Sequence, residues 1–174
     1  LDGDGRPELV TIDEGYEPNV AVLRLGDDGP REAGAYTVVP GGTGLARGLK
    51  AVAAGDWNGD GKIDLAVSGS LLTGAALLFG NGDGTFKPPV TIGDDKSYWA
   101  VLGADVNGDG KLDLVMTVQR GESVSVLLGK GDGTFRPALP SAAGRSAMQL
   151  VAGDWDRDGK LDLATLHREG GSVL

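Results

Sequence analysis

One acidic stretch occurs three times along this chain of 174 residues. The segments GDWNGDGKIDLAV, ADVNGDGKLDLVM and GDWDRDGKLDLAT place Asp56, Asp105 and Asp154 at intervals of 49 residues, and a shorter copy, LDGDGRPELV, opens the chain. A repeat of this length restricts the fold to architectures in which one small unit is used several times. The sequence therefore predicts a single domain of about three and a half units. Their expected boundaries are 1–44, 45–93, 94–142 and 143–174.

Each unit is expected to form four short β-strands. In the second unit, apolar runs at 49–54 and 75–79 flank the segment 62–68, whose apolar residues alternate with the period of a half-buried strand. The Asn-Gly turn at Asn81 predicts a hairpin, and the prolines within 86–92 favour an outer edge strand. Because no long stretch has helical periodicity, we predict an all-β fold of four-stranded antiparallel blades, as in β-propellers.

The recurring loop follows the pattern Asp-x-Asn/Asp-x-Asp-Gly-x-x-Asp. Oxygen donors at alternate positions of a tight loop converge on one point, the glycine permits the sharp turn, and the seventh position offers its backbone carbonyl. Hard oxygen ligands in this number suit calcium, whereas without a cation the crowded carboxylates would raise one another's pKa. The predicted ligands of three full calcium sites are Asp56, Asn58, Asp60, Lys62 and Asp64; Asp105, Asn107, Asp109, Lys111 and Asp113; and Asp154, Asp156, Asp158, Lys160 and Asp162.

The opening copy of the loop begins at its later positions. A fourth, partial calcium site is therefore predicted at Asp2, Asp4, Arg6 and Glu8. Since a natural domain is not expected to begin inside a metal loop, we expect this chain to be part of a longer polypeptide that supplies the rest of the propeller.

Asp, Asn and Gly also form turns that bind no metal, and this chain contains such turns for comparison. Asp83 and Asp132 lie in equally Gly-rich turns, but Lys87 and Arg136 stand four residues later in place of a carboxylate. We interpret those two turns as metal-free hairpins. EF-hand and dockerin loops are excluded as well, because they end in a carboxylate at position twelve beside helices, and the twelfth positions here fall inside predicted strands.

These loops, with the Leu-Phe-Gly and Thr-Phe elements that follow them, resemble the FG-GAP/VCBS repeats of integrin α-type β-propellers over nearly the whole chain. The resemblance implies seven blades around a central channel, with the calcium loop joining the first and second strands of each blade. It also implies a ligand face on the side opposite these loops. Related repeats occur in bacterial surface proteins, some lectins and some polysaccharide-degrading enzymes. On this basis the chain would form about half of a ring.

The units differ in length on one predicted face only. The first unit is seven residues longer than the others, and the extra residues fall outside the acidic loops. Such insertions commonly mark a binding side, where aromatic planes beside polar groups suit a sugar or a protein. The alternative for Tyr98 and Trp99 is packing at the start of the first strand, and Trp57 and Trp155 are expected to pack between blades. The predicted ligand face comprises Tyr16, Arg47, Tyr98, Trp99, Glu122 and Arg145.

The amino-acid composition argues against several classes of function. A net charge of −9 argues against a nucleic-acid partner, the absence of cysteine excludes disulfides and thiol nucleophiles, and the apolar runs are too short to span a membrane. The single His167 lies near no recognisable nucleophile motif, which argues against an enzyme. We predict a non-catalytic, calcium-stabilised adhesion or carbohydrate- or protein-binding module, extracellular or at the cell surface. The alternatives are a propeller segment of a secreted polysaccharide lyase or hydrolase with catalytic residues elsewhere, and a purely structural blade array.

Overall fold

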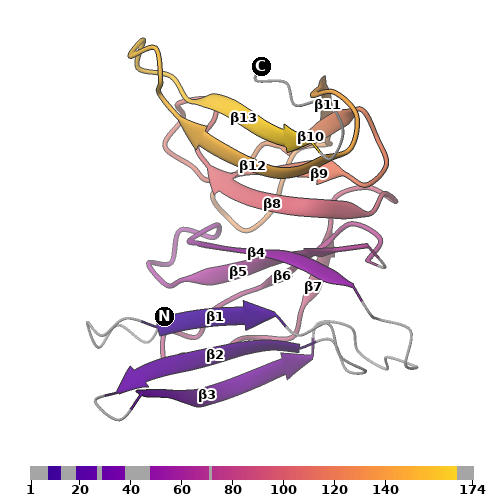
Figure 1. Cartoon of the computed structure of the whole chain (residues 1–174). Helices are drawn as coiled ribbons and strands as arrows, with labels where there is room; N and C mark the ends of the chain where they lie inside the picture. Colours follow the sequence, from indigo (N-terminus) through magenta and orange to yellow (C-terminus); the bar gives the residue numbers. More distant parts are fainter. Residues whose placement is uncertain (1–7, 13–18, 27–28, 38–47, 71, 168–174) are drawn as a thin grey trace.

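The computed structural model describes residues 8–12, 19–26, 29–37, 48–70 and 72–167, and for 19, 23–26 and 29–37 it describes the backbone alone. These residues form β-strands and connecting turns without any helix, arranged as four sheets that follow one another along a stack (Figure 1). The strands are β1 (Glu8–Ile12), β2 (Asn19–Gly26), β3 (Gly29–Thr37), β4 (Leu49–Gly55), β5 (Asp64–Gly69), β6 (Ala75–Leu78), β7 (Val90–Ile92), β8 (Tyr98–Ala104), β9 (Asp113–Val118), β10 (Ser123–Leu127), β11 (Leu139–Ala142), β12 (Ala147–Gly153) and β13 (Asp162–His167).

Every sheet is an antiparallel meander. The two central sheets have the orders β4-β5-β6-β7 and β8-β9-β10-β11, whereas the first has three strands, β1-β2-β3, and the last has two, β12-β13. The all-β class and the four-stranded antiparallel blades are thereby confirmed. The described sheets do not close into a ring, so the total number of blades and the repeat boundaries stay predictions.

The outermost strand of the second sheet is shorter than predicted. Strand β7 pairs with β6 only over Val90–Ile92, and Phe86 forms an isolated bridge with Gly80. Pro88 and Pro89 lie between these two contacts and have no amide hydrogen to donate to a ladder. The prolines therefore restrict this edge strand to its last three residues.

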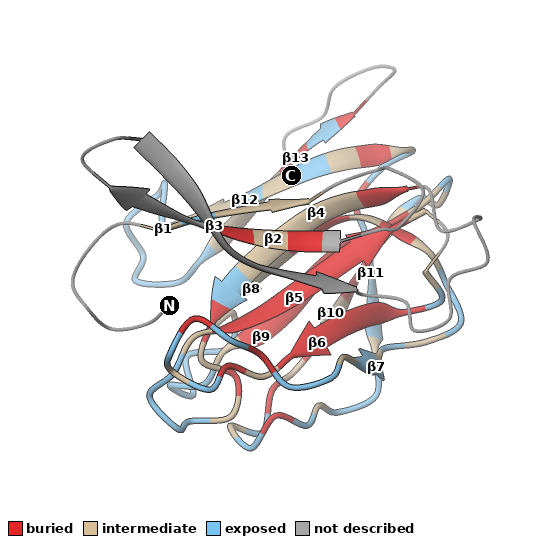
Figure 2. Cartoon of the chain, turned by 90° about the horizontal axis from the view of Figure 1, so that it is seen from below, coloured by how far each residue is buried: buried red, intermediate tan, exposed pale blue. Residues whose placement is uncertain are grey.

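The hydrophobic core lies between successive sheets. Strands β5 and β9 are buried along their whole length, because each belongs to a sheet that has neighbours on both sides (Figure 2). One cluster, which includes Trp57, Leu77 and Leu114, joins the second and third sheets, and another, which includes Val20 and Leu65, joins the first and second. The stack is thus held together by side chains that fill the space between blades.

The last sheet, β12-β13, has a neighbouring sheet on one side only among the described residues. Val151 and Leu166 of this sheet, and Trp155 in the loop between its strands, are 54–58% exposed, whereas Leu65, Leu77 and Leu114 in the two central sheets are 0% exposed. None of the described residues forms a helix of the length and apolarity that a membrane crossing requires.

Candidate metal loops and ligand face

The first residue of each acidic loop organises the turn that follows it. The Asp56 carboxylate accepts hydrogen bonds from the amides of Gly59 (2.8 Å), Asp60 (3.2 Å) and Gly61 (2.8 Å). Gly59 and Gly61 have φ angles of 72° and 78°, a left-handed conformation that glycine adopts without steric cost. The loop is therefore shaped by contacts between residues at most five positions apart.

The other two loops repeat this conformation. Asp105 accepts hydrogen bonds from the amides of Gly108, Asp109 and Gly110 at 2.7–3.1 Å, and these contacts, with that of Gly110 the strongest, lower the pKa of the Asp105 carboxyl. Asp154 accepts from Asp158 and Gly159 at 3.0–3.1 Å. The sequence pattern thus produces the same local geometry three times.

The ninth residue of the loop is buried at the start of the second strand. Asp64 is 0% exposed, and its carboxylate accepts hydrogen bonds from the amides of Trp57 (3.1 Å) and Gly80 (2.9 Å). Burial raises the pKa of Asp64, the two backbone hydrogen bonds oppose that shift, and the nearby carboxylates of Asp60 and Asp56 add to it. This carboxylate therefore connects its own loop to the hairpin that follows β6.

Asp113 occupies the same place in the next sheet. Its carboxylate accepts hydrogen bonds from the amides of Val106 (3.0 Å) and Gly129 (2.8 Å). Burial raises its pKa, against the effect of these hydrogen bonds and together with that of Asp109 and Asp105. A nearby divalent cation would favour the ionised form of both buried carboxylates.

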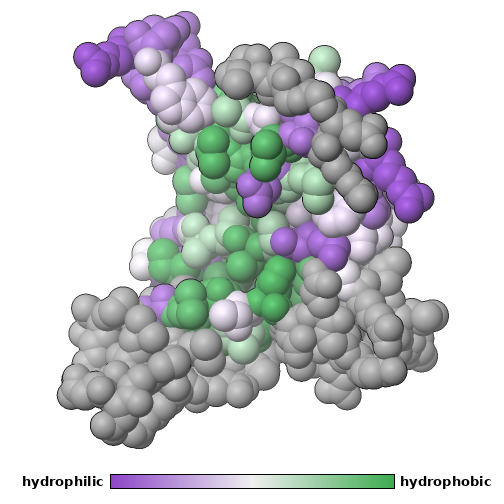
Figure 3. All heavy atoms as spheres, viewed as in Figure 1, coloured by the Kyte–Doolittle hydropathy of each residue, from purple (hydrophilic) through white to green (hydrophobic). Residues whose placement is uncertain are grey.

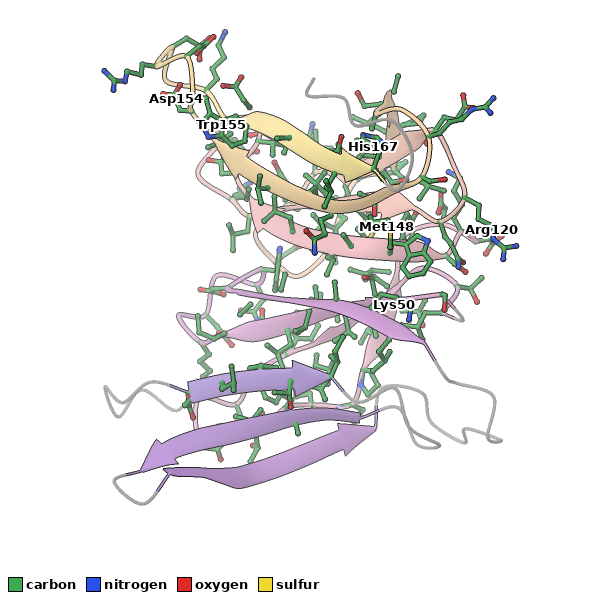
Figure 4. All side chains as sticks on the ribbon, in the orientation of Figure 1. Lys50, Arg120, Met148, Asp154, Trp155 and His167 are labelled. Atoms are coloured by element: carbon green, nitrogen blue, oxygen red, sulfur yellow. The ribbon has the colours of Figure 1, made fainter. Side chains whose placement is uncertain are left out.

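The third loop brings three carboxylates together. Asp154, Asp156 and Asp162 each place an oxygen within 4.8 Å of the others, in the loop that extends from the end of β12 (Figure 4, near Asp154). Asn58 and Asn107 replace the second of these carboxylates in the earlier loops. Carboxylate and amide oxygens so arranged have the chemistry that calcium prefers.

The seventh residue of each full acidic loop is a lysine. The amides of Lys62, Lys111 and Lys160 donate to the fifth-position carboxylates Asp60, Asp109 and Asp158, and the role of their carbonyls as ligands stays a prediction.

In the partial loop, Glu8 begins β1, whereas Asp2, Asp4 and Arg6 lie outside the described residues. Asp83 and Asp132 each accept a hydrogen bond from the amide of a threonine two residues later, the contact that forms an Asx turn.

The third loop contains a strained residue. Arg157 has a φ of 64°, at the position that Gly59 and Gly108 occupy in the other loops. A side chain in this conformation costs roughly 1–2 kcal/mol, and the greater flexibility of an unfolded glycine offsets about half of that. We therefore expect Arg157→Gly to stabilise the protein by about 0.5–1 kcal/mol, as measured by the midpoint of urea unfolding.

The reverse substitution is the matched control for this prediction. Gly108→Arg places a side chain at the equivalent position, where a Cβ would meet nothing within 4 Å. It should destabilise by a similar amount, because only the backbone conformation opposes it. If both substitutions shifted the midpoint in the same direction, backbone strain would not be the cause.

Tyr98, which was predicted to lie on the ligand face, is buried in the core. Its side chain is 0% exposed, and its hydroxyl donates to the Asp94 carboxylate and contacts the Ser125 hydroxyl at 3.3 Å. Burial and the neighbouring Asp94 carboxylate raise the pKa of Tyr98 to about 12. The ring therefore packs at the start of β8, which was the alternative considered for it, and offers no surface to a ligand.

Trp99, the next residue, is only partly buried. The Lys50 ammonium lies 5.2 Å from the centroid of its indole ring, and a groove of about 510 Å³ runs along β4, β8 and β12 beside it. Figure 4 shows Lys50 and Met148 on the strands that flank β8, and Figure 3 shows apolar atoms gathered on this side. The predicted ligand face did not include Lys50 and Met148, although each lies one repeat of 49 residues from Trp99.

Two other residues of the predicted ligand face, Glu122 and Arg145, contact each other. The Arg145 guanidinium and the Glu122 carboxylate form a 2.6 Å ion pair between two exposed turns, whereas Tyr16 and Arg47 lie outside the described residues.

His167 is buried, and its ring nitrogens contact the Arg145 carbonyl (2.7 Å) and the Thr165 hydroxyl (2.8 Å). Both nitrogens of the single histidine therefore have structural partners.

Comparison with known proteins agrees with this geometry. A family model described as an FG-GAP-like repeat matches residues 1–67, 56–116 and 105–165. No curated protein matches the chain. Among solved structures, an Agrocybe aegerita lectin, described as recognising non-reducing terminal N-acetylglucosamine, is 22% identical with a TM-score of 0.56. The match covers 92% of this chain but only 46% of the lectin chain, and at this identity it shows a shared fold.

Proposed function

The chain belongs to the FG-GAP-like repeat family, and from this premise we propose that it is a calcium-stabilised, non-catalytic binding module of the extracellular space or cell surface. The observation that carries the proposal is the convergence of Asp154, Asp156 and Asp162 within a loop conformation that the other two loops share. Oxygen donors at this spacing are the ligands that calcium takes from proteins.

Each calcium ion would be held by the first, third, fifth and ninth side chains of a loop and by its seventh carbonyl. Three ions would reduce the formal net charge of the chain from −9 to −3. The metal therefore offsets the repulsion among carboxylates that the turns hold close together. A longer parent polypeptide supplies the remaining blades in this proposal.

The ligand we propose is a carbohydrate, bound on the side where Trp99 borders the groove. The fold shared with a lectin and the partly exposed indole ring support this choice, because the apolar face of a sugar stacks on aromatic planes. Lys50 and Gln149 line the same groove and would add hydrogen-bond partners for hydroxyl groups.

Glycan-array binding in calcium and in chelator tests this function, with N-acetylglucosamine-terminated glycans as the first probe. We expect binding that is lost in chelator and weakened at least tenfold by Trp99→Ala. Trp155→Ala is the control, because that exposed tryptophan lies outside the groove. Absence of binding to any glycan would favour a purely structural array of blades.

A further inference from the structure

Trp57 connects two successive acidic loops. It is the second residue of the loop 56–64, and its amide donates to the buried carboxylate of Asp64 at 3.1 Å. Its ring is 1% exposed and crosses to the third sheet, where an added Cβ on Gly103 would lie 2.7 Å from it. The indole Nε1 donates a long hydrogen bond of 3.5 Å to the carbonyl of Asp113, the ninth residue of the next loop.

A second connection reaches the same residue through the hairpin between β10 and β11. The amide of Gly133 donates to the Trp57 carbonyl at 2.9 Å, and the amide of Gly129, at the start of this hairpin, donates to the Asp113 carboxylate at 2.8 Å. The two connections therefore begin at Trp57 and end at Asp113.

The next pair of loops lacks this arrangement. Val106 occupies the place of Trp57 in the loop 105–113 and, as an aliphatic side chain, has no hydrogen-bond donor. Trp155 in the loop 154–162 is 54% exposed. Among the described residues, an indole thus joins the first loop to the second, but none joins the second to the third.

We propose that the loops 56–64 and 105–113 bind calcium cooperatively through Trp57, whereas the loop 154–162 binds independently. The inference rests on the proposed calcium function. A cation held by Asp56 and Asp64 restrains the backbone of Trp57, and with it the position of Asp113. The second loop is then partly ordered before its own cation arrives, and linkage requires the reverse effect to be equal.

Calorimetric calcium titration of loop-disabled variants tests this coupling. In a chain carrying Asp109→Ala, which removes the fifth-position oxygen ligand and disables the loop 105–113, we expect the affinity of the loop 56–64 to fall about fivefold or more. The matched control is Asp158→Ala, which disables the loop 154–162 in the same way and should leave that affinity unchanged. Asp109 and Asp158 occupy the same loop position and are both exposed, so the two variants differ only in which loop they disable.

Substitutions of Trp57 test whether the coupling between the two loops depends on its side chain. Trp57→Val copies the residue at Val106 and should abolish the effect of Asp109→Ala, while Trp57→Phe keeps a ring against Gly103 and should retain part of it. If Trp57→Val fails to fold, the comparison of Asp109→Ala with Asp158→Ala still decides. Equal effects of these two variants would overturn the coupling alone, whereas a chain that binds no calcium would overturn the proposed function as well.

Discussion

Removal of calcium is expected to lower the melting temperature of this chain by about 15–30 °C. At a free calcium concentration 100 times the dissociation constant, each occupied loop stabilises the folded state by about 2.7 kcal/mol, so three loops contribute roughly 8 kcal/mol. For a domain of this size each kcal/mol shifts the melting temperature by about 2–4 °C. The measurement is thermal unfolding followed by circular dichroism in calcium and in EDTA.

A variant with all three loops disabled provides the control. Asp60→Ala, Asp109→Ala and Asp158→Ala together remove one oxygen ligand from each loop, so the combined variant should melt at the same temperature in calcium and in EDTA. An unchanged melting temperature of the unmodified chain in EDTA would contradict the calcium assignment of the loops.

Truncation of Trp57 is expected to cost about 3–5 kcal/mol, the usual effect of replacing a buried tryptophan by alanine. Trp57→Ala would leave a void between the second and third sheets, because the ring contacts Gly103 and belongs to the core cluster that joins them. Since a domain of this kind is stabilised by only about 5–15 kcal/mol, the loss should be evident in urea unfolding.

Trp155→Ala is the matched control, because Trp155 occupies the same loop position 98 residues later. Its side chain is 54% exposed, so its truncation should change the free energy of unfolding by no more than about 0.5 kcal/mol. Comparable losses for the two substitutions would mean that the second loop position does not stabilise the chain through packing between sheets.

The acidic loops could be predicted because their geometry is local. The carboxylate of Asp56 and the amides that it accepts from lie within five residues of one another, and glycine at the left-handed positions is visible in the sequence. The same holds for the turns at Asp83 and Asp132. The repeat of 49 residues then indicates how many such units the chain contains.

The sequence could not separate the buried from the partly exposed side chains of the predicted ligand face, because burial depends on neighbouring sheets. Tyr98 and Trp99 are adjacent in the sequence, yet Tyr98 is buried against Ser125 while Trp99 borders the groove with Lys50. Successive residues of a strand point to opposite sides, and the sequence does not say which side a neighbouring blade will cover. The groove residues Lys50 and Met148 were missed for the same reason.

The two tryptophans in the loops show the division between local and tertiary information. The expected packing between blades is confirmed for Trp57, but Trp155 is exposed because no described sheet lies beyond β12-β13. The amino-acid sequence by itself determined the repeated unit, its strands and the conformation of its acidic loops, since these depend on residues close together in the chain. Only the tertiary structure decided which loop contacts the next sheet and which side chains line the groove, because those contacts join residues about 50 positions apart.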